Sequence, residues 1–474
     1  MISFATSHRR ACIAAAVLAS ILSGGCATLS ADGGFGPVEQ AARDRLGKDL
    51  TWARTDADRD AIDQRVAELL LQPLSADAAV QVALLNNKGL QASFDELGIS
   101  EADVVQAGRL PNPGFSFGRL RQGSGTEIDR SVTFNFARLL TQPMAHRIET
   151  QRFEQTRGAV TLRMLSLAAD TRKAYLLAVA ADETLRYMHQ VQTAAEAGAE
   201  LARRQARVGN WNKLQLAREQ SFYADAALNL ARAEQARGAA RERLTRLLGL
   251  WGPQTQFVLP DRLPDLPQAP NELPDIEQTA MAQRLDVQAA RRGSEQVAQS
   301  LGLTRTTRFL DVLEVSGHRN SFNDAPTEHG FEVSFELPLF DWGEARVARA
   351  ESIYMQSVHR AAETAVNARS EVRGAYAGYR TSYDIARHFR DEIVPLKKRI
   401  SEENQLLYNG MLIGVFELLA DARSQITSVN GYIEALRDFW LAQADLDMAL
   451  IGPANATPMP PSTLPSFDSG SAGH

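Results

Sequence analysis

The sequence predicts a mainly α-helical protein with a small β part, built from long antiparallel helical hairpins that occur twice. Three observations predict this fold: two helical tracts of unusual length, two pairs of short alternating strands, and an internal repeat that contains one of each. The formal net charge of -6 comes from 51 basic and 57 acidic residues spread along 474 residues. This distribution offers no basic surface for nucleic acid, so we expect no nucleic acid partner.

The repeat is visible in matching stretches of the two halves. Residues 83–92 parallel residues 280–289, and residues 208–220 parallel residues 413–425. Six prolines, which cannot lie inside a helix, separate the halves: Pro253, Pro260, Pro264, Pro267, Pro270 and Pro274.

Six segments follow from this pattern. They are, in chain order, a signal peptide (1–25), an N-terminal tether (26–75), a first structural repeat of one helix, two strands and two long helices (76–250), a proline-rich linker (251–274), a second repeat (275–452) and a tail (453–474). The tether lacks strong periodicity, so we expect it to be extended. The tail is rich in Pro, Ser and Gly, and we expect it to be disordered.

The beginning of the chain has the pattern of a secretory signal. A positive region at residues 8–10 precedes an apolar stretch at residues 13–22, which is too short to span a bilayer. Three small residues then lead to Cys26, an arrangement that resembles the bacterial lipobox, although Leu22 stands four residues before the cysteine rather than the usual three. We therefore expect Cys26 to be lipidated. The alternative is ordinary cleavage nearby, with Cys26 lost or free.

Two strand pairs are predicted from alternation of apolar and polar residues. In the first half, residues 115–118 and 132–136 alternate on either side of a glycine-rich turn at residues 123–125. In the second half, residues 312–316 and 331–337 alternate in the same way on either side of residues 320–328. Alternation of this kind places one face of each strand in an apolar medium.

The long helical tracts cover residues from about 144 to 206 and from about 342 to 408. Both are rich in Ala, Arg, Glu and Leu, and each could run as one helix of roughly 90 to 100 Å at 1.5 Å per residue. The helices that return from them carry apolar stripes in steps of three and four. These stripes are Leu214, Ala217, Ser221, Ala224, Leu228 and Ala231 in the first half, and Val415, Leu419, Ala422, Ile426, Val429, Ile433, Leu436 and Trp440 in the second. The stripe of the first half is the weaker one, with smaller side chains, and taken alone the stripes favour the core of an ordinary helical bundle.

Four strands are too few to close a membrane barrel, which needs at least about eight. An open sheet edge in lipid would leave backbone groups unpaired. We therefore expect several chains to share one transmembrane β-barrel and to continue it as an α-barrel of helical hairpins, which together form a conduit. Glu332 and Glu336 alternate with apolar residues, so we expect both to face the lumen.

At this point the chain resembles the TolC-like outer-membrane efflux proteins from about residue 75 to residue 452. The most specific match is residues 408–410 followed by residues 416–423, which are similar to the family's tyrosine and glycine turn with its acidic, leucine-rich stretch. The resemblance implies a homotrimer with a shared barrel, docking onto a periplasmic adaptor and an inner-membrane pump. It also implies a lipid-anchored protein of the bacterial outer membrane that extends into the periplasm.

The same resemblance implies a periplasmic gate at the ends of the helical hairpins. Asp421 is the preferred candidate, with Glu417 four residues before it on the same helix face. Tyr408 and Arg423 are weaker candidates that could hold the gate closed. The alternative is that the carboxylates are simply solvated. The turns, which are also the expected adaptor contacts, contain Gly209, Asn210, Gly410 and Gly414, and we expect these glycines to supply the left-handed backbone there.

The sequence contains no convincing catalytic or cofactor site. Residues 114–118 match the nucleophile-elbow pattern of hydrolases, but they alternate as a strand and no helix begins after them. His318 and His329 lack further ligands at a recognisable spacing, so we expect no metal site and no cofactor. A passive efflux channel is therefore the leading hypothesis, with a periplasmic adaptor or scaffold lipoprotein and a lipid-anchored hydrolase as alternatives. Drugs, metal ions and other small molecules all remain candidate substrates.

Overall fold

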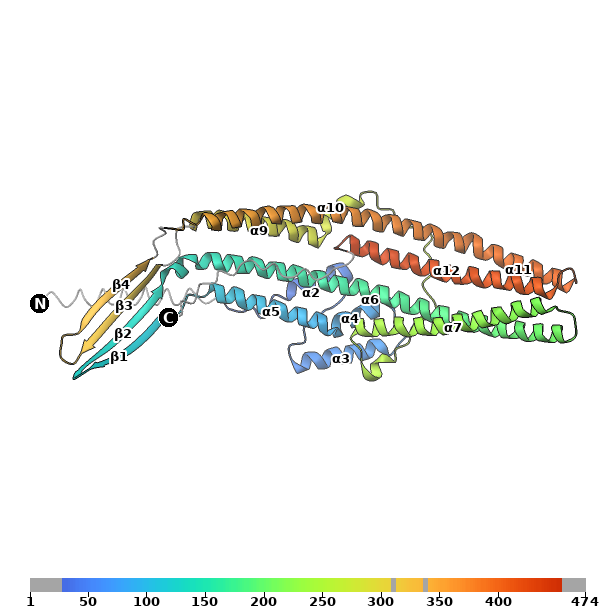
Figure 1. Ribbon diagram of the computed structural model, residues 1–474, viewed down its shortest axis with the longest axis horizontal. Helices are drawn as coiled ribbons and strands as arrows, with labels where there is room; N and C mark the ends of the chain where they lie inside the picture. Colours follow the sequence, from blue (N-terminus) through green and yellow to red (C-terminus); the bar gives the residue numbers. More distant parts are fainter. Residues whose placement is uncertain (1–27, 308–312, 336–339, 454–474) are drawn as a thin grey trace. The chain divides into compact units, whose positions relative to one another are not determined.

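The computed structural model describes residues 28–307, 313–335 and 340–453. This part of the chain is mainly helical and contains one four-stranded antiparallel sheet (Figure 1), which confirms the predicted fold class at this level. The predicted signal peptide, Cys26 and the tail from residue 454 onward lie outside the described residues.

The elements are labelled as in Figure 1. In chain order they are α2 (Gly36–Leu46), α3 (Asp56–Leu70), α4 (Ala76–Asn86), α5 (Lys88–Gly108), β1 (Gly114–Gln122), β2 (Gly125–Asn135), α6 (Phe136–Arg207), α7 (Lys213–Leu248), the short helix η1 (Gly252–Thr255), α8 (Ile276–Gln283), α9 (Leu285–Thr307), β3 (Leu313–Phe322), β4 (Glu328–Phe335), α10 (Glu344–His388), the π-helical η2 (Phe389–Ile393), α11 (Val394–Asn409) and α12 (Val415–Ala449).

Two compact units divide the chain. Unit 1 consists of Met1–Val38, Ser93–Val160 and Ala289–Glu363, and it contains all four strands. Unit 2 consists of Glu39–Ala92, Thr161–Gln288 and Thr364–His474, and it contains both helix-to-helix turns and the main hydrophobic core.

The sheet of unit 1 joins the two strand pairs edge to edge in the order β1-β2-β3-β4. Both predicted strand pairs are present, and each is longer than its alternating stretch. The turn between β1 and β2 contains Gly123 with φ of 61°, a left-handed conformation that glycine adopts without steric cost. Because β1 and β4 are the two ends of this order, each has one edge without a partner strand in the described chain.

The two long tracts differ. The first is a single helix, α6, of 72 residues, which confirms the prediction of one long helix, but it begins eight residues earlier than expected and contains Pro143. The second is interrupted, because five residues, Phe389–Ile393, form a π-helical turn between α10 and α11. Pro395, the second residue of α11, follows this turn, and a proline lacks the backbone N–H and clashes with the carbonyl four residues before it, here that of Asp391. The prediction of one uninterrupted helix is therefore wrong for this tract.

Part of the segment predicted as an extended tether is helical. Within residues 26–75 the chain forms α2 and α3, and Ile62 and Val66 of α3 are buried. A capping box starts α3: the Asp58 backbone N–H donates to the Thr55 hydroxyl at 3.2 Å, and the Thr55 backbone N–H donates to the Asp58 carboxylate at 2.8 Å. The expectation of an extended conformation is wrong for these residues.

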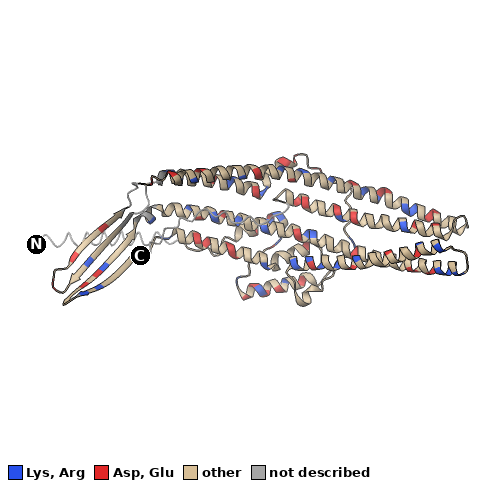
Figure 2. Ribbon diagram, viewed as in Figure 1, with Lys and Arg blue, Asp and Glu red and all other residues tan. Residues whose placement is uncertain are grey.

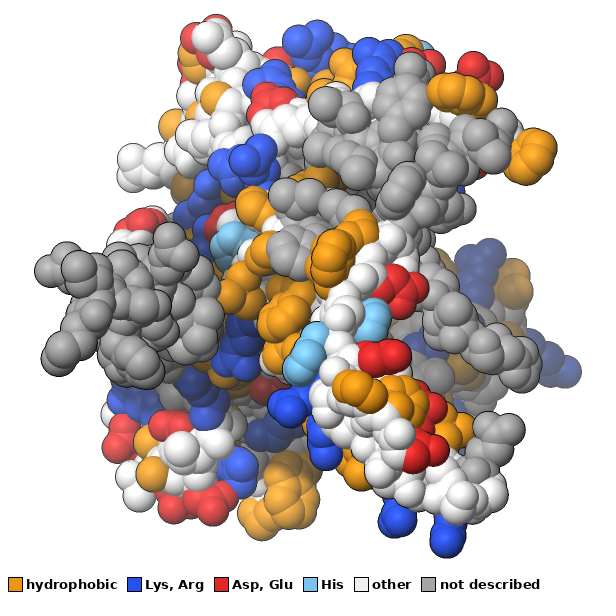
Figure 3. Space-filling model, turned by 90° about the vertical axis from the view of Figure 1, so that its left-hand side faces the viewer, with side chains coloured by type: hydrophobic (Ala, Val, Ile, Leu, Met, Phe, Trp, Pro, Cys, Tyr) orange, Lys and Arg blue, Asp and Glu red, His pale blue; other side chains and the backbone are white. Residues whose placement is uncertain are grey.

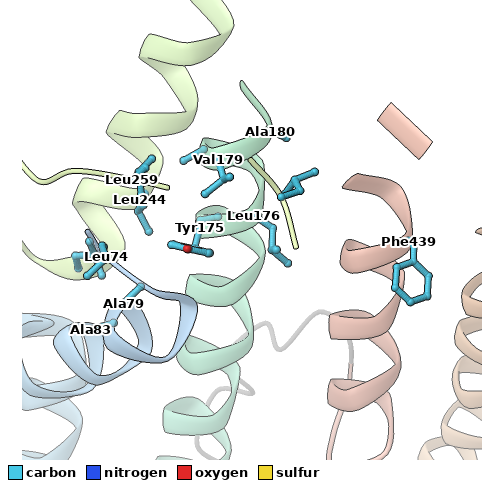
Figure 4. Packing of buried hydrophobic residues seen from close by; sticks show 14 of the residues in the cluster. Leu74, Ala79, Ala83, Tyr175, Leu176, Val179, Ala180, Leu244, Leu259 and Phe439 are labelled. Carbon is cyan, nitrogen blue, oxygen red and sulfur yellow. The ribbon is translucent and has the colours of Figure 1, made fainter. Parts of the chain in front are cut away.

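The core of unit 2 is formed by helices from both halves of the chain. Figure 4 shows Tyr175 of α6 close to Leu244 of α7, and Leu176 and Val179 of α6 belong to the same cluster. The proline-rich linker is not a loose connection, because its residues Leu259, Leu263 and Leu266 belong to the same cluster. Tyrosine and tryptophan side chains bind the linker backbone: Tyr383 Oη donates to Gln268 O at 2.7 Å, and Trp440 Nε1 donates to Pro264 O at 2.9 Å.

Candidate functional site

The register of the sheet separates its side chains into two chemically different faces, because neighbouring residues on a strand point to opposite sides. The face that we call the polar face carries Ser116, Glu127, Asp129, Ser131, Thr133, Ser316, His318, Asn320, Glu328 and Glu332, together with two apolar residues near the strand turns, Leu120 and Phe322. The face that we call the apolar face carries Phe115, Phe117, Ile128, Val132, Phe134, Val315, Phe331 and Val333, together with Arg119, Arg121, Arg130, Arg319 and His329. Figure 2 shows both acidic and basic residues on the strands.

The apolar face is uncovered. Phe115 is 70% exposed, Phe117 60% and Phe331 80%. Figure 3 shows hydrophobic side chains exposed among charged ones on the face turned toward the viewer. An exposed aromatic face of this kind is typical of a surface that meets lipid or another protein.

Glu332 lies on the polar face, in the row that pairs it with Ser316 and continues to Thr133. On the same face, Asn320 Nδ2 donates to Glu127 Oε1 at 3.0 Å. Glu336, the second residue predicted to face a lumen, lies outside the described residues. That the polar face lines a lumen remains a prediction.

The turn between α6 and α7 is a Schellman motif centred on Gly209. The Gly209 N–H donates to Ala206 O at 3.1 Å and the Asn210 N–H donates to Gln205 O at 2.9 Å. Gly209 has φ of 82°, which is the left-handed conformation that closes this motif. The prediction that Gly209 supplies the left-handed backbone therefore agrees with the geometry of this turn.

The turn between α11 and α12 is a second Schellman motif, but its left-handed residue is Met411, with φ of 58°. The Met411 N–H donates to Tyr408 O at 2.9 Å and the Leu412 N–H to Leu407 O at 2.8 Å. Gly410 has φ of -80° and Gly414 has φ of -85°. The expectation that these two glycines are left-handed is wrong, because the hydrogen-bond pattern places that conformation one residue after Gly410.

Both turns expose apolar side chains. Val208 beside the first turn is 69% exposed, and Met411 and Leu412 in the second are 92% and 74% exposed. The two hairpins also touch each other, since the ring of Trp211 meets the ring of Phe416 at a centroid distance of 6.2 Å in an edge-on arrangement. Exposed apolar groups at a helical turn favour contact with a protein partner.

The two acidic gate candidates have different surroundings. Glu417 caps its own helix, because the Gly414 N–H donates to Glu417 Oε2 at 3.2 Å. Its carboxylate therefore has a structural role at the start of α12. Asp421 Oδ2 is shielded from solvent and has no hydrogen-bond partner within the described chain. Of the two carboxylates, Asp421 is therefore the one for which the hydrogen bonds of the described chain show no structural role.

Arg423 and Tyr408 do not meet. The Arg423 guanidinium forms an ion pair with Glu219 of α7, which is 1% exposed, and it lies 4.7 Å from the ring of Phe222. This contact connects the two hairpins across 204 positions of sequence. Tyr408 is 37% exposed at the end of α11. Sequence reasoning missed Glu219, and the available signal was an acidic residue where the matching position of the other half has Ser424.

The weaker signals of the sequence have simple explanations. Ser116 lies within β1, and its hydroxyl is 2.7 Å from that of Ser131, so the hydrolase-like pattern is part of a strand. Within residues 28–307, 313–335 and 340–453, no group of three or more His, Cys, Asp or Glu side chains is placed to hold a metal ion. Nor does any helix in those ranges have the length and apolar character to cross a membrane.

Comparison with known proteins gives one curated relative and several solved structures. The cobalt-zinc-cadmium resistance protein CzcC of Cupriavidus metallidurans is 24% identical over 284 residues, which cover 59% of this chain and 66% of the relative. The chain thus spans slightly less than two thirds of that relative's length. No protein-family model matches the chain.

Several of the similar solved structures are described as outer-membrane channels. The CmeC channel of Campylobacter jejuni has a TM-score of 0.66 at 16% identity, covering 87% of this chain and 91% of that one. The open MtrE channel of Neisseria gonorrhoeae has a TM-score of 0.65 at 20% identity, covering 79% and 88%. The chain therefore has the fold of the TolC-like outer-membrane channels, the family that its sequence resembles.

Proposed function

We propose that the chain is the outer-membrane channel of a tripartite efflux system. In this proposal three copies place their sheets side by side in one transmembrane barrel, and the helical hairpins, which we infer arose by duplication, form an α-barrel in the periplasm. The protein is then a passive duct with no catalytic activity of its own. A lipid on Cys26 holds its N-terminus at the outer membrane.

One observation carries the proposal: a four-stranded sheet with two open edges separates an uncovered apolar face from a polar face. In lipid each unpaired backbone group costs several kcal/mol, so the open edges of β1 and β4 require partner strands. Pairing with the sheets of other copies satisfies both edges. It also turns the apolar face toward lipid and the polar face toward an aqueous lumen.

The polar face also supports a preference of the lumen for cations. Its described residues include Glu127, Asp129, Glu328 and Glu332, and no lysine or arginine. Rings of carboxylates favour cations over anions in a pore. The likeness to a protein named for cobalt, zinc and cadmium resistance supports metal ions as one cargo. Other small molecules remain within the proposed range, because the pump and the adaptor select what enters.

The gate is proposed at the second turn. Asp421 from three copies would form a ring of carboxylates at the axis, where its unpartnered oxygen could receive a cation. Glu417 is the weaker candidate because it already caps α12. Arg423, paired with Glu219, holds the two hairpins of one chain together and would resist their separation on opening. Tyr408 belongs to the Schellman turn, where its carbonyl accepts from the Met411 N–H, and it is a further candidate for the closed-state contacts.

The adaptor contact is proposed at both turns, at Gly209 with Asn210 and at Gly410 with Gly414. The exposed apolar side chains beside them, Met411 above all, support this assignment. An adaptor that covers these residues would bury apolar surface and bias the turns toward an open arrangement.

Single-channel conductance in planar bilayers tests the proposal. The purified protein should give discrete openings, and a divalent cation added on the periplasmic side should block them. Asp421→Ala should weaken the block about tenfold or more, whereas Glu417→Ala should weaken it less. Absence of conductance from well-folded trimers would overturn the channel proposal. Equal block in the wild type and in both variants would leave the channel but move the gate elsewhere.

A further inference from the structure

Four arginines lie on the apolar face of the sheet, near the turns of the strand pairs. Three of them are neighbours across the strands, and the fourth, Arg121, lies two residues beyond Arg119 on β1. Arg130 of β2 and Arg319 of β3 are direct cross-strand partners. Arg119 of β1 pairs with Ile128, which places it diagonally beside Arg130. Directly paired Cβ atoms are about 5 Å apart and diagonal neighbours about 7 to 8 Å apart. The three guanidinium groups therefore share one small surface, which we call the arginine cluster.

No carboxylate of the sheet balances this cluster. The acidic residues of the described strands with a described side chain lie on the opposite, polar face. Within the described part of the chain, none of the three arginines forms an ion pair with any other element. Like charges placed directly opposite each other destabilise a sheet. An external anion would remove this repulsion.

The position of the cluster indicates what that anion belongs to. On the same face, the next row toward the helices contains Phe115, Val132 and Phe331, and the row after that contains Phe134 and Val333. Successive rows are about 7 Å apart along a strand. If the apolar rows lie in hydrocarbon, the arginine row, which also contains Phe117, lies at the level of the lipid headgroups, where aromatic residues are enriched.

We infer that the arginine cluster binds the phosphate groups of a membrane lipid at the outer surface. The inference rests on the proposed function, because it requires the apolar face to lie in the membrane with the strand turns outside. Guanidinium groups pair with phosphate through two parallel hydrogen bonds, which distinguishes them from ammonium groups. The cluster fits a lipid that carries phosphate monoesters, as the glycolipid of an outer leaflet does, better than a zwitterionic phospholipid whose own ammonium neutralises its phosphate.

Native mass spectrometry of the full-length, detergent-solubilised protein tests this inference, with diphosphoryl lipid A as the probe and phosphatidylcholine as the comparison lipid. Lipid A should bind to the wild type in preference to phosphatidylcholine. The double variant Arg130→Gln with Arg319→Gln should weaken lipid A binding at least tenfold. Each hydrogen bond between charged groups that is lost should raise the dissociation constant about tenfold. Arg130→Lys with Arg319→Lys should recover part of the affinity, because the charge remains but the paired geometry does not.

Arg291→Gln with Arg292→Gln is the matched control, since it removes the same charge from two exposed positions of α9. It should leave lipid A binding unchanged. Equal loss in both double variants, or equal binding of the two lipids to the wild type, overturns the arginine cluster as a specific site. Planar bilayer recordings distinguish failure of the arginine cluster as a lipid site from failure of the proposed channel function. A double variant that still inserts and conducts but has altered lipid A affinity supports both the lipid site and the channel function. A wild type that never inserts overturns both.

Discussion

The two helix-to-helix turns have the same hydrogen-bond pattern and are built from different residues. The first has Gly209 at the left-handed position, and Asn212 then starts α7 with a capping box in which the Gln215 N–H donates to Asn212 Oδ1 at 2.9 Å. The second has Met411 at the left-handed position, and α12 starts at Gly414, which has no side chain to cap the helix. Only Glu417 reaches back to this N-terminus.

The other ends of the return helices also differ between the halves. The end of α7 is held by amide side chains: Asn86 Nδ2 donates to Gly249 O at 2.8 Å, and Asn87 Nδ2 donates to Leu247 O at 3.0 Å. The end of α12 is held by a buried cation, because Arg284 Nη1 donates to Ala449 O at 3.2 Å and the side chain is 1% exposed.

The guanidinium of Arg284 is balanced by two carboxylates. Its Nη2 is 2.7 Å from Asp286 Oδ2 and 2.8 Å from Glu371 Oε2. Burial lowers the pKa of Arg284, but the hydrogen bond and charge of Asp286, with those of Glu371, outweigh burial and raise it above its ordinary value. The second half therefore has a weakly capped, strained turn at one end and a strong ionic anchor at the other. We expect its turn to open at a lower free energy than the turn of the first half.

The largest expected effect is at the ionic anchor. Arg284→Met removes a buried cation and leaves Asp286 and Glu371 without their partner, which should destabilise unit 2 by about 3 kcal/mol. Thermal unfolding of the solubilised protein measures the change. The matched variant in the first half, Asn87→Ala, loses one hydrogen bond to Leu247 and the cap of α5, and should cost about 1 to 2 kcal/mol. Equal losses would contradict the difference between the two anchors.

The next effect is at the contact between the hairpins. Glu219→Gln keeps the shape of the side chain but removes the charge that pairs with Arg423, at a cost of about 2 kcal/mol. Amide hydrogen exchange should become faster in α7 and α12 near the turns, and the proposed function predicts more frequent openings at rest in planar bilayers. Glu200→Gln is the control, because its partners Arg203 and Arg204 lie on the same helix near the same turn. It should change neither measurement, and a change as large as that of Glu219→Gln would refute the assigned role of the contact.

The conformation of the turns gives a smaller effect. Gly209→Ala forces a side chain into the left-handed region and should cost about 1 to 2 kcal/mol. Gly410→Ala should cost little, since Gly410 has φ of -80° and an added Cβ would find its nearest neighbour, Leu406 O, at 3.5 Å. Thermal unfolding and local hydrogen exchange of the two variants compare the turns directly. A larger loss at Gly410 would mean that its turn has the conformation expected from sequence.

Sequence predicted the strands well, because alternation is a local signal and a strand pair with a short turn needs little tertiary information. The turn at Gly123 helps to set the register of β1 against β2, and that register decides which residues lie side by side across these two strands. The position of the left-handed residue was less accessible. Because this segment contains two glycines within five residues, Gly410 and Gly414, we expected the left-handed conformation at those glycines. The position of the left-handed residue in a Schellman motif depends instead on which backbone carbonyls lie at the end of α11.

The remaining features needed the folded chain. Glu219 and Arg423 are 204 positions apart, and neither lies at a position of the apolar stripes, so no periodicity connects them. The burial of Arg284 follows from the packing of α10 and α12 around it and has no local signature. By contrast, the helix at Asp56–Leu70 could have been found, because Thr55 and Asp58 have the spacing of a capping box before two apolar residues.

The smallest expected effect tests the strain at the second turn itself. Met411→Gly relieves the left-handed conformation of a side-chain residue, worth about 1 to 2 kcal/mol, but glycine loses about 0.4 to 1 kcal/mol through its more flexible unfolded state. The net stabilisation should be about 0.5 to 1 kcal/mol, seen as slower hydrogen exchange at the end of α11. Met411→Ala is the control, because it removes the same exposed side chain and keeps the strain. If the turn is the element that yields on opening, Met411→Gly should also lower the resting open frequency while Met411→Ala does not. Equal behaviour of the two variants would show that the second turn owes its lability to the missing cap at Gly414 rather than to backbone strain.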